Sequence, residues 1–310
     1  MRKKNALIIS GGGAWGAYGG GTLSRLDNDY DTIIGISTGA LLAPFSSVKR
    51  WDILKEAYTS INQTNIFDKS WYKPYPISKK GRIRKLPIIL SLIFGDKSIS
   101  TSKNLRKLID EYFFQDIYDQ IISEKKRVLV GVQNYAQDPS ILHHFNILEE
   151  DFSDFKDWMW ASANAPFFTS LLNKSWRDTV GNFHVGQWTD GGLTEFVSFG
   201  PILNTTEKYS TVDIILHRNK KDIKYEGYGV NNFLGNVTRG IDAMRYDIEF
   251  ENFYNKIEHL NKRGTTVNLY WLPRKLSPNS LMFDQKLMTE WWEEGYETAL
   301  DLDRIDTFKP

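Results

Sequence analysis

Residues 6–16 read Ala6-Leu-Ile-Ile-Ser-Gly-Gly-Gly-Ala-Trp-Gly16, an apolar run that ends in three consecutive glycines. The first four residues predict a buried strand, because a short apolar run bounded by glycines is typical of a strand inside a sheet. Thr32 to Ile36 forms a second run of the same kind. We expect a helix over 14–26 between them, since two parallel strands need a crossover connection.

The second run leads into Gly35-Ile-Ser37-Thr-Gly39, and residues 40–48 begin a predicted helix. A G-x-S-x-G motif at a strand-to-helix turn is typical of a nucleophile elbow, which holds a serine hydroxyl above the sheet. Gly35 and Gly39 would admit the strained backbone and close neighbours that such a turn needs. The β-α-β-α order predicts a three-layer α/β/α fold with a central mixed, mainly parallel sheet.

The remaining chain carries further periodic segments. Apolar runs predict strands, and helical spacing predicts helices, the first of them capped by Thr101 or Ser102. The expected strands cover 128–132, 212–216 and 267–272, and the expected helices 105–113, 152–163, 230–260 and 285–302. Because no repeat or linker-like stretch forces a boundary, we predict one domain over 1–310. Its C-terminal part, about 230–310, is expected to be mainly helical.

Composition excludes several classes of function. The chain has 39 Lys and Arg against 38 Asp and Glu, a formal net charge of +1, so its overall charge gives no reason to expect a nucleic-acid partner. The absence of cysteine rules out disulfides, thiolate catalysis and Cys-ligated zinc. Neither a metal nor a cofactor is predicted. The N-terminus lacks the long apolar core of a signal peptide and no stretch is long enough to span a membrane, so we expect a cytoplasmic protein.

One segment stands apart and predicts a variable insert or lid over about 60–100. Five basic residues lie within Lys79 to Lys85, and the apolar run Leu86 to Phe94 follows them. The first expectation is a core helix with a solvated basic approach. The alternative is peripheral contact with a membrane through about 71–94, since a basic and apolar surface element suits a bilayer interface.

The glycine-rich turn supports two hypotheses. Gly11, Gly13 and Gly16 satisfy G-x-G-x-x-G, which after a strand indicates a dinucleotide site. That site also needs an acidic residue at the end of the second strand, where Ser37 stands instead. The second hypothesis is an oxyanion hole made by the N–H groups of Gly11, Gly12 and Gly13, because consecutive glycines let backbone donors approach a developing negative charge.

A serine nucleophile needs a base, and the sequence leaves two arrangements open. In the order Ser…Asp…His, Asp190 could act with His217 or His259. Alternatively, Asp190 could act by itself, because Asp190-Gly-Gly192 places a carboxylate on an open turn after a stretch of β character.

Together these motifs resemble the patatin-like phospholipase family. Gly11 to Gly16 is similar to its glycine-rich oxyanion motif, Gly35 to Gly39 to its nucleophile elbow, and Asp190 to Gly192 to its catalytic aspartate motif. Ala161-Ser-Ala-Asn-Ala-Pro-Phe-Phe168 resembles a further segment of the family. The resemblance covers about 5–220. It departs from the family at Trp15, where a basic residue is usual, and after Gly192, where an Asn-x-Pro element is common.

The resemblance implies a lipid acyl hydrolase, of phospholipase A or lysophospholipase type, that uses a Ser–Asp dyad without a histidine. Ser37 would attack the ester and form an acyl-enzyme, Asp190 would assist proton removal, and Gly11 to Gly13 would hold the oxyanion. An aspartate of reference pKa about 3.9 is a weak base for a serine hydroxyl. Desolvation in an apolar pocket is expected to raise the pKa of Asp190 and make it a stronger base. Two alternatives stay open: a non-catalytic lipid-binding effector of the same fold, and a Ser-His-Asp esterase.

Overall fold

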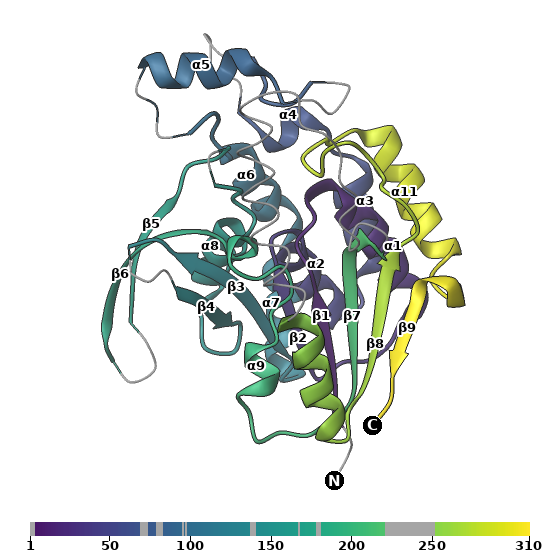
Figure 1. Cartoon of the computed structure of the whole chain (residues 1–310). Helices are drawn as coiled ribbons and strands as arrows, with labels where there is room; N and C mark the ends of the chain where they lie inside the picture. Colours follow the sequence, from purple (N-terminus) through teal and green to yellow (C-terminus); the bar gives the residue numbers. More distant parts are fainter. Residues whose placement is uncertain are drawn as a thin grey trace.

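The computed structural model describes residues 4–68, 74–78, 83–94, 96, 98–136, 141–166, 168–177, 181–220 and 252–310. Within them, the strands form one nine-stranded sheet in the order β5-β6-β3-β2-β1-β7-β8-β9, and β4 pairs with β3 off this path (Figure 1). The strands are β1 (Lys4–Ile9), β2 (Thr32–Ile36), β3 (Arg127–Asn134), β4 (Ile141–Asn146), β5 (Leu172–Arg177), β6 (Phe183–Asp190), β7 (Tyr209–Asn219), β8 (Thr266–Leu272) and β9 (Ile305–Phe308).

The sheet is mixed and mainly parallel at its centre, as the sequence predicts. Strands β3, β2, β1, β7 and β8 run parallel to one another. All five were predicted from their apolar runs. Of the antiparallel strands, β6 is the stretch of β character expected before Asp190, and β4, β5 and β9 were not predicted as strands. Strand β5, with the sequence Leu-Asn-Lys-Ser-Trp-Arg, shows why: its side chains alternate between half-buried and exposed positions, and it contains no apolar run.

The helices predicted over 14–26, 40–48, 105–113, 152–163 and 285–302 form with shifted ends, and the structure contains further helices that were not predicted. The helices are α1 (Gly16–Leu26), α2 (Thr38–Ser47), α3 (Trp51–Thr59), α4 (Gln63–Ile66), α5 (Lys85–Phe94), α6 (Lys103–Tyr112), α7 (Gln115–Ser123), α8 (Phe152–Ser162), α9 (Gly200–Leu203) and α11 (Gln285–Glu297), with 3-10 turns η1 (Gly13–Trp15), η2 (Gly191–Leu193) and η4 (Leu302–Arg304). Residues 252–262 are also helical. The predicted helix over 230–260 lies outside the described residues up to 251.

Two details of the predicted helices are corrected. Helix α11 ends at Glu297 rather than near 302, where a separate 3-10 turn forms. Ser102 does stand at the N-terminus of α6, but its hydroxyl makes no capping bond. It donates instead to the side-chain oxygen of Asn164, so the cap expected there is replaced by a contact with the segment after α8.

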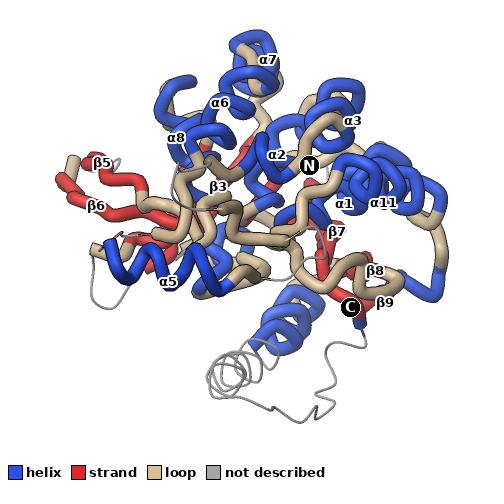
Figure 2. The backbone as a smooth tube through the Cα atoms, turned by 90° about the horizontal axis from the view of Figure 1, so that it is seen from above, coloured by secondary structure: helices blue, strands red, loops and turns tan. Residues whose placement is uncertain are grey.

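Both faces of the sheet are buried, which gives three layers. Side chains alternate along β1: Leu7 and Ile9 point into one apolar core and Ala6 and Ile8 into another, all of them fully buried. The first core lies under α1, α2, α3, α8 and α11, and the second under α9 and residues 252–262. Figure 2 shows α1, α2, α8 and α11 together on one side of the strands. The α/β/α prediction is therefore confirmed.

Helix α5 differs from the other helices in its exposure. Leu86, Ile89 and Ile93, spaced so as to share one face, are 54%, 50% and 69% exposed, whereas Pro87 and Ser91 are buried. The expectation of a core helix here is wrong. Figure 1 shows α5 at the end of the molecule toward which the parallel strands point. Among the described helices, none has the length and apolarity that crossing a bilayer requires.

Candidate active site

Ser37 forms a strained turn between β2 and α2. Its backbone has φ 57° and ψ −124°, a conformation that non-glycine residues rarely adopt. The turn is tightly packed, because a Cβ at Gly35 would lie 2.1 Å from the carbonyl oxygen of Gly39. A Cβ at Gly39 would lie 2.2 Å from the carbonyl oxygen of Ile9. Gly35 and Gly39 are therefore both required, because any side chain there would collide with a neighbouring backbone carbonyl. Ser37, which lies between them, is only half-buried.

The register of β3 explains how Ser37 and Asp190 meet. Strand β2 pairs with β3 up to Ile36, opposite Gly131, and β6 pairs with β3 from Asp190, opposite Val132. Strand β4 pairs with both stretches of β3, so β2 and β6 must share its opposite edge. Because β2 is parallel to β3 and β6 is antiparallel, their carboxyl ends meet head-on at this point. Ser37 and Asp190 are the residues at which the two strands end.

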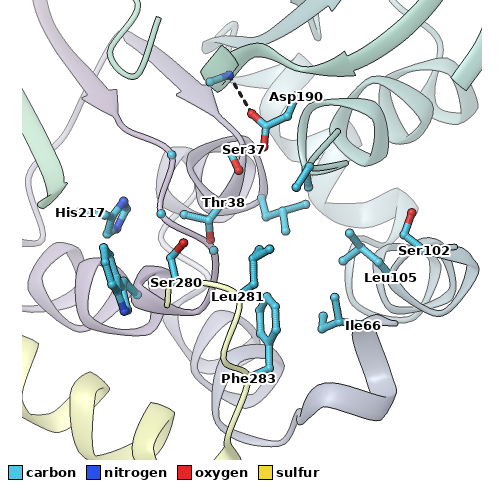
Figure 3. Close-up of a pocket in the computed structure, with 18 of the residues that line it drawn as sticks. Ser37, Thr38, Ile66, Ser102, Leu105, Asp190, His217, Ser280, Leu281 and Phe283 are labelled. Carbon is cyan, nitrogen blue, oxygen red and sulfur yellow. Dashed lines mark hydrogen bonds between the residues drawn. The ribbon is translucent and has the colours of Figure 1, made fainter. Parts of the chain in front are cut away.

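Asp190 is held by the turn that follows it. Its carboxylate oxygen Oδ1 accepts a hydrogen bond of 2.7 Å from the N–H of Gly192, and only 8% of the residue is exposed. Figure 3 shows this bond and shows the Asp190 carboxylate next to the Ser37 hydroxyl at one end of a cavity. A Cβ at Gly192 would lie 2.9 Å from Oδ1, so the glycine permits the bond.

The glycine-rich turn lies directly against Ser37. A Cβ at Gly11 would lie 3.1 Å from the Cβ of Ser37. The N–H of Gly11 donates to the carbonyl of Phe196 at 3.4 Å, whereas in the described part of the chain no acceptor faces the N–H groups of Gly12 and Gly13. Gly13 has φ 52°, which favours glycine. Helix α1 begins directly after η1, so its positive dipole end lies at the glycine-rich turn.

A cavity of about 570 Å³ connects these groups. Gly11, Gly12, Gly13, Ser37, Asp190 and Gly192 all line it, so the structure brings the predicted site residues together. Most of the remaining wall is apolar and comes from α2, α3, α4, α6 and the loop 280–283, and Ile109 is one of its side chains. Figure 3 shows Ile66, Leu105, Leu281 and Phe283 in this wall. Such a volume and lining suit one small apolar ligand or chain.

His217 lines the cavity but is not placed as a base for Ser37. Its Nδ1 is 2.9 Å from the carbonyl oxygen of Ser10, and a Cβ at Gly19 would lie 2.2 Å from its Nε2. Burial lowers the pKa of His217 to about 4, although the bond to the Ser10 carbonyl acts in the opposite direction. Figure 3 shows His217 apart from the Ser37 and Asp190 pair. His259 is exposed on the helical residues 252–262 and does not line the cavity.

Two further histidines lie on β4, which pairs with β3. His143 and His144 are neighbours on β4 and face opposite ways, as expected of a strand. His144 lies 2.6 Å from the hydroxyl of Ser198 through Nε2, and burial lowers its pKa to about 4. His143 packs among aromatic rings, including that of Trp188. Neither lines the cavity that contains Ser37.

Two features of the site were not predicted from the sequence. Trp15, which stands where the resemblance expects a basic residue, donates from its indole to Ser277 at 2.8 Å and ties the glycine-rich turn to the loop before α11. Arg218 supplies the positive charge that lines the cavity, with its guanidinium carbon 4.6 Å from the ring centroid of Phe196. Arg218 follows His217 near the carboxyl end of a central strand, where ligands usually bind in an α/β sheet, and this position could have identified it from the sequence.

Comparisons with known proteins identify the family of this chain. No curated protein matches the chain. A solved structure, the crystal structure of VipD from Legionella pneumophila, is similar at 13% identity and a TM-score of 0.43, over 100% of this chain and 68% of the other. The family model of the patatin-like phospholipases matches residues 7–203, nearly two thirds of the sequence. The chain therefore belongs to the patatin-like phospholipase family, which generally carries lipid acyl hydrolase activity.

Proposed function

We propose that this protein is a serine acyl hydrolase that cleaves fatty-acyl esters of lipids with Ser37 and Asp190 as its dyad. The observation that carries the proposal is the meeting of β2 and β6 at one point of β3, which brings a serine on a strained elbow to a buried carboxylate. Both face a cavity whose wall is mostly apolar. An ester with a long acyl chain is the substrate that such a wall would bind.

The arrangement supports a two-step reaction. Ser37 Oγ attacks the ester carbonyl carbon while its proton passes to the carboxylate of Asp190. The N–H groups of Gly12 and Gly13 stabilise the oxyanion, which collapses as the carbon–oxygen bond to the alcohol breaks and Asp190 returns the proton to that alcohol. Water then attacks the acyl-enzyme by the same route, and the fatty acid leaves. No histidine takes part.

The cavity also supports a lipid of phospholipase A or lysophospholipase type. The apolar wall would accommodate the acyl chain, and Arg218 lines the same cavity with its guanidinium over the ring of Phe196. Guanidinium groups bind phosphate oxygens well, so a substrate with a phosphate near the ester would gain a charged contact there.

Fluorophosphonate labelling and ester hydrolysis test the dyad. The wild type should form a covalent adduct on Ser37 and hydrolyse p-nitrophenyl esters, and Ser37→Ala should do neither. Asp190→Asn keeps an oxygen for the Gly192 N–H but loses the base, so its turnover should fall by about 10²- to 10⁴-fold. Ser123→Ala, an exposed serine on α7, is the control. Full activity in a folded Ser37→Ala or Asp190→Asn protein contradicts the proposal.

The same experiment separates the alternatives. A wild type that binds lipid but forms no adduct on Ser37 would be a non-catalytic lipid-binding protein. A Ser-His-Asp esterase would require His217→Asn to be as inactive as Ser37→Ala while still folded. The contacts of His217 with Ser10 and Gly19 favour the dyad over this triad.

We also propose that α5 makes peripheral contact with an anionic membrane surface. Three observations support this contact. The face formed by Leu86, Ile89 and Ile93 is exposed, Arg84 and Lys85 at its start are exposed, and α5 lies at the end of the molecule toward which the parallel strands point (Figure 1). An apolar face beside cations fits a bilayer interface that carries negative charge.

Vesicle co-sedimentation tests this contact. The wild type should bind vesicles that contain phosphatidylserine more tightly than pure phosphatidylcholine vesicles, and added salt should weaken the binding. The double variant Leu86→Glu/Ile93→Glu should lose binding by about tenfold or more, because two exposed apolar side chains no longer enter the interface. Leu302→Glu, at a position that is 82% exposed on η4, is the matched control. Equal binding by all three proteins would exclude α5 as the contact.

A further inference from the structure

A buried hydroxyl replaces the hydrogen bond that the elbow breaks. Ser162, the last residue of α8, is fully buried. Its Oγ accepts a hydrogen bond of 3.0 Å from the N–H of Ser37 and donates one of 2.7 Å to the carbonyl of Gly131. The register of β2 against β3 would join these same two groups directly if the parallel ladder continued by one residue. The Ser162 hydroxyl therefore bridges the two backbone groups that the next hydrogen bond between β2 and β3 would have joined.

This insertion satisfies two buried backbone groups while Ser37 leaves the sheet. A buried N–H or carbonyl without a partner is strongly disfavoured, so an elbow at this point needs a substitute partner for each. The Ser162 hydroxyl is one acceptor and one donor, which matches the requirement. The backbone of Ser37 can then turn to φ 57° without leaving either group unpaired.

The residues that follow Ser162 hold the other half of the dyad. The main-chain carbonyl of Asn164 accepts hydrogen bonds from the N–H of Asp190 at 3.1 Å and from the hydroxyl of Thr189 at 2.9 Å. Asn164 is itself fully buried, and its side-chain oxygen accepts from Ser102 at the start of α6. One short turn after α8 therefore contacts the backbone of both Ser37 and Asp190.

We propose that Ser162 is a positioning residue for the nucleophile, and that the turn from Ser162 to Asn164 fixes the separation between Ser37 and Asp190. The inference rests on the proposed function of that dyad. Ser162 is not placed to touch the substrate, because it is fully buried and is not among the residues that line the cavity. It acts on the direction in which the Ser37 hydroxyl points.

Three variants test this role. Ser162→Ala removes both hydrogen bonds, so kcat and the rate of fluorophosphonate labelling should fall by about 100-fold, the loss expected when a reacting atom is displaced by about 1 Å. KM for the ester should stay near the wild-type value, because the apolar wall is untouched. Ser162→Thr keeps the hydroxyl and should restore most of the labelling rate. Ser46→Ala, which removes another buried serine hydroxyl, on α2, controls for a general loss of stability.

The outcomes are separable. If the wild type forms no adduct and hydrolyses no ester, the proposed function fails. If the wild type is active and folded Ser162→Ala labels as fast as Ser46→Ala, the role of Ser162 is overturned. Should Ser162→Ala not fold, Ser162→Cys takes its place, because a thiol is a weak donor and acceptor with longer bonds. Folded Ser162→Cys with wild-type labelling would likewise overturn the inference, and slow labelling rescued in Ser162→Thr supports it.

Discussion

His217 offers a test in which acid pH is the perturbation. Its Nδ1 faces the Ser10 carbonyl, and its Nε2 is buried without a partner in the described residues and packs against Gly19. A proton added at Nε2 would find no acceptor, which is why burial lowers the pKa to about 4 from 6.5. The unfolded chain binds that proton near pH 6.5, whereas the folded protein binds it only near pH 4. Stability is therefore lost as pH falls through 6.5 toward 4.

The size of the effect follows from the same values. One pKa unit corresponds to about 1.4 kcal/mol, so lowering the pH from 7.5 to 4.5 should remove about 2 kcal/mol of unfolding free energy through His217. Urea unfolding followed by tryptophan fluorescence at the two pH values measures this loss. In His217→Asn, which can still donate to the Ser10 carbonyl, the loss between pH 7.5 and 4.5 should be smaller than in the wild type by about 2 kcal/mol.

His259→Asn is the matched control, because this histidine is exposed. It should lose as much stability as the wild type on acidification. If His217→Asn loses as much as these two proteins, then His217 is not held neutral by burial and the reasoning fails. The same variant should keep kcat/KM within about tenfold of the wild type, because a general base contributes about 10²- to 10⁴-fold and His217 is not expected to be one.

Four further substitutions probe the site. Gly35→Ala should fail to fold, because its Cβ would lie 2.1 Å from a backbone carbonyl; a yield of folded protein equal to wild type would contradict this packing. Gly11→Ala should fold but react slowly, by about tenfold or more, since its methyl presses on Ser37 from 3.1 Å; unchanged labelling would refute the contact. Ile109→Trp should shorten the cavity and lower kcat/KM for palmitoyl esters by about tenfold relative to butyryl esters, and equal losses would place the chain elsewhere. Arg218→Gln should reduce the preference for phosphate-bearing substrates over neutral esters, whereas an unchanged ratio would remove Arg218 from substrate binding.

The central strands were predictable because each is buried on both faces and so reads as a mostly apolar run, with Asp213 in β7 and Asn268 in β8 as the charged or amide exceptions. Strand β2 is buried at all five positions, whereas β5 alternates and carries polar residues on its exposed side. Helix α5 was mispredicted for a related reason. An apolar segment such as Leu86 to Phe94 is required equally by a core helix and by one that faces a bilayer, and only the tertiary position separates the two.

The meeting of Ser37 and Asp190 could not be derived from spacing. It depends on β6, whose antiparallel direction and register were not predicted, and which ends opposite Val132 where β2 has just ended. The resemblance to a family predicted that Ser37 and Asp190 act together. The register of β2 and β6 on β3 explains why the two residues lie close together. Ser162 was still harder to identify, because a serine at the end of a helix is ordinary. Its role can be recognised only in the structure, where its hydroxyl bonds to the Ser37 N–H and the Gly131 carbonyl in place of the direct hydrogen bond between them.

The elbow and Ser162 also balance each other energetically. A residue held at φ 57° costs about 1–3 kcal/mol, and two hydrogen bonds of about 1 kcal/mol each offset most of that cost. Loss of the hydroxyl would leave Ser37 strained with an unpaired N–H, unless its backbone relaxed toward the β region and paired directly with Gly131. Relaxation would recover stability and turn the nucleophile back into the sheet. A stable but slow Ser162→Ala protein is therefore the expected result, since the strain at Ser37 persists only while another group completes the ladder.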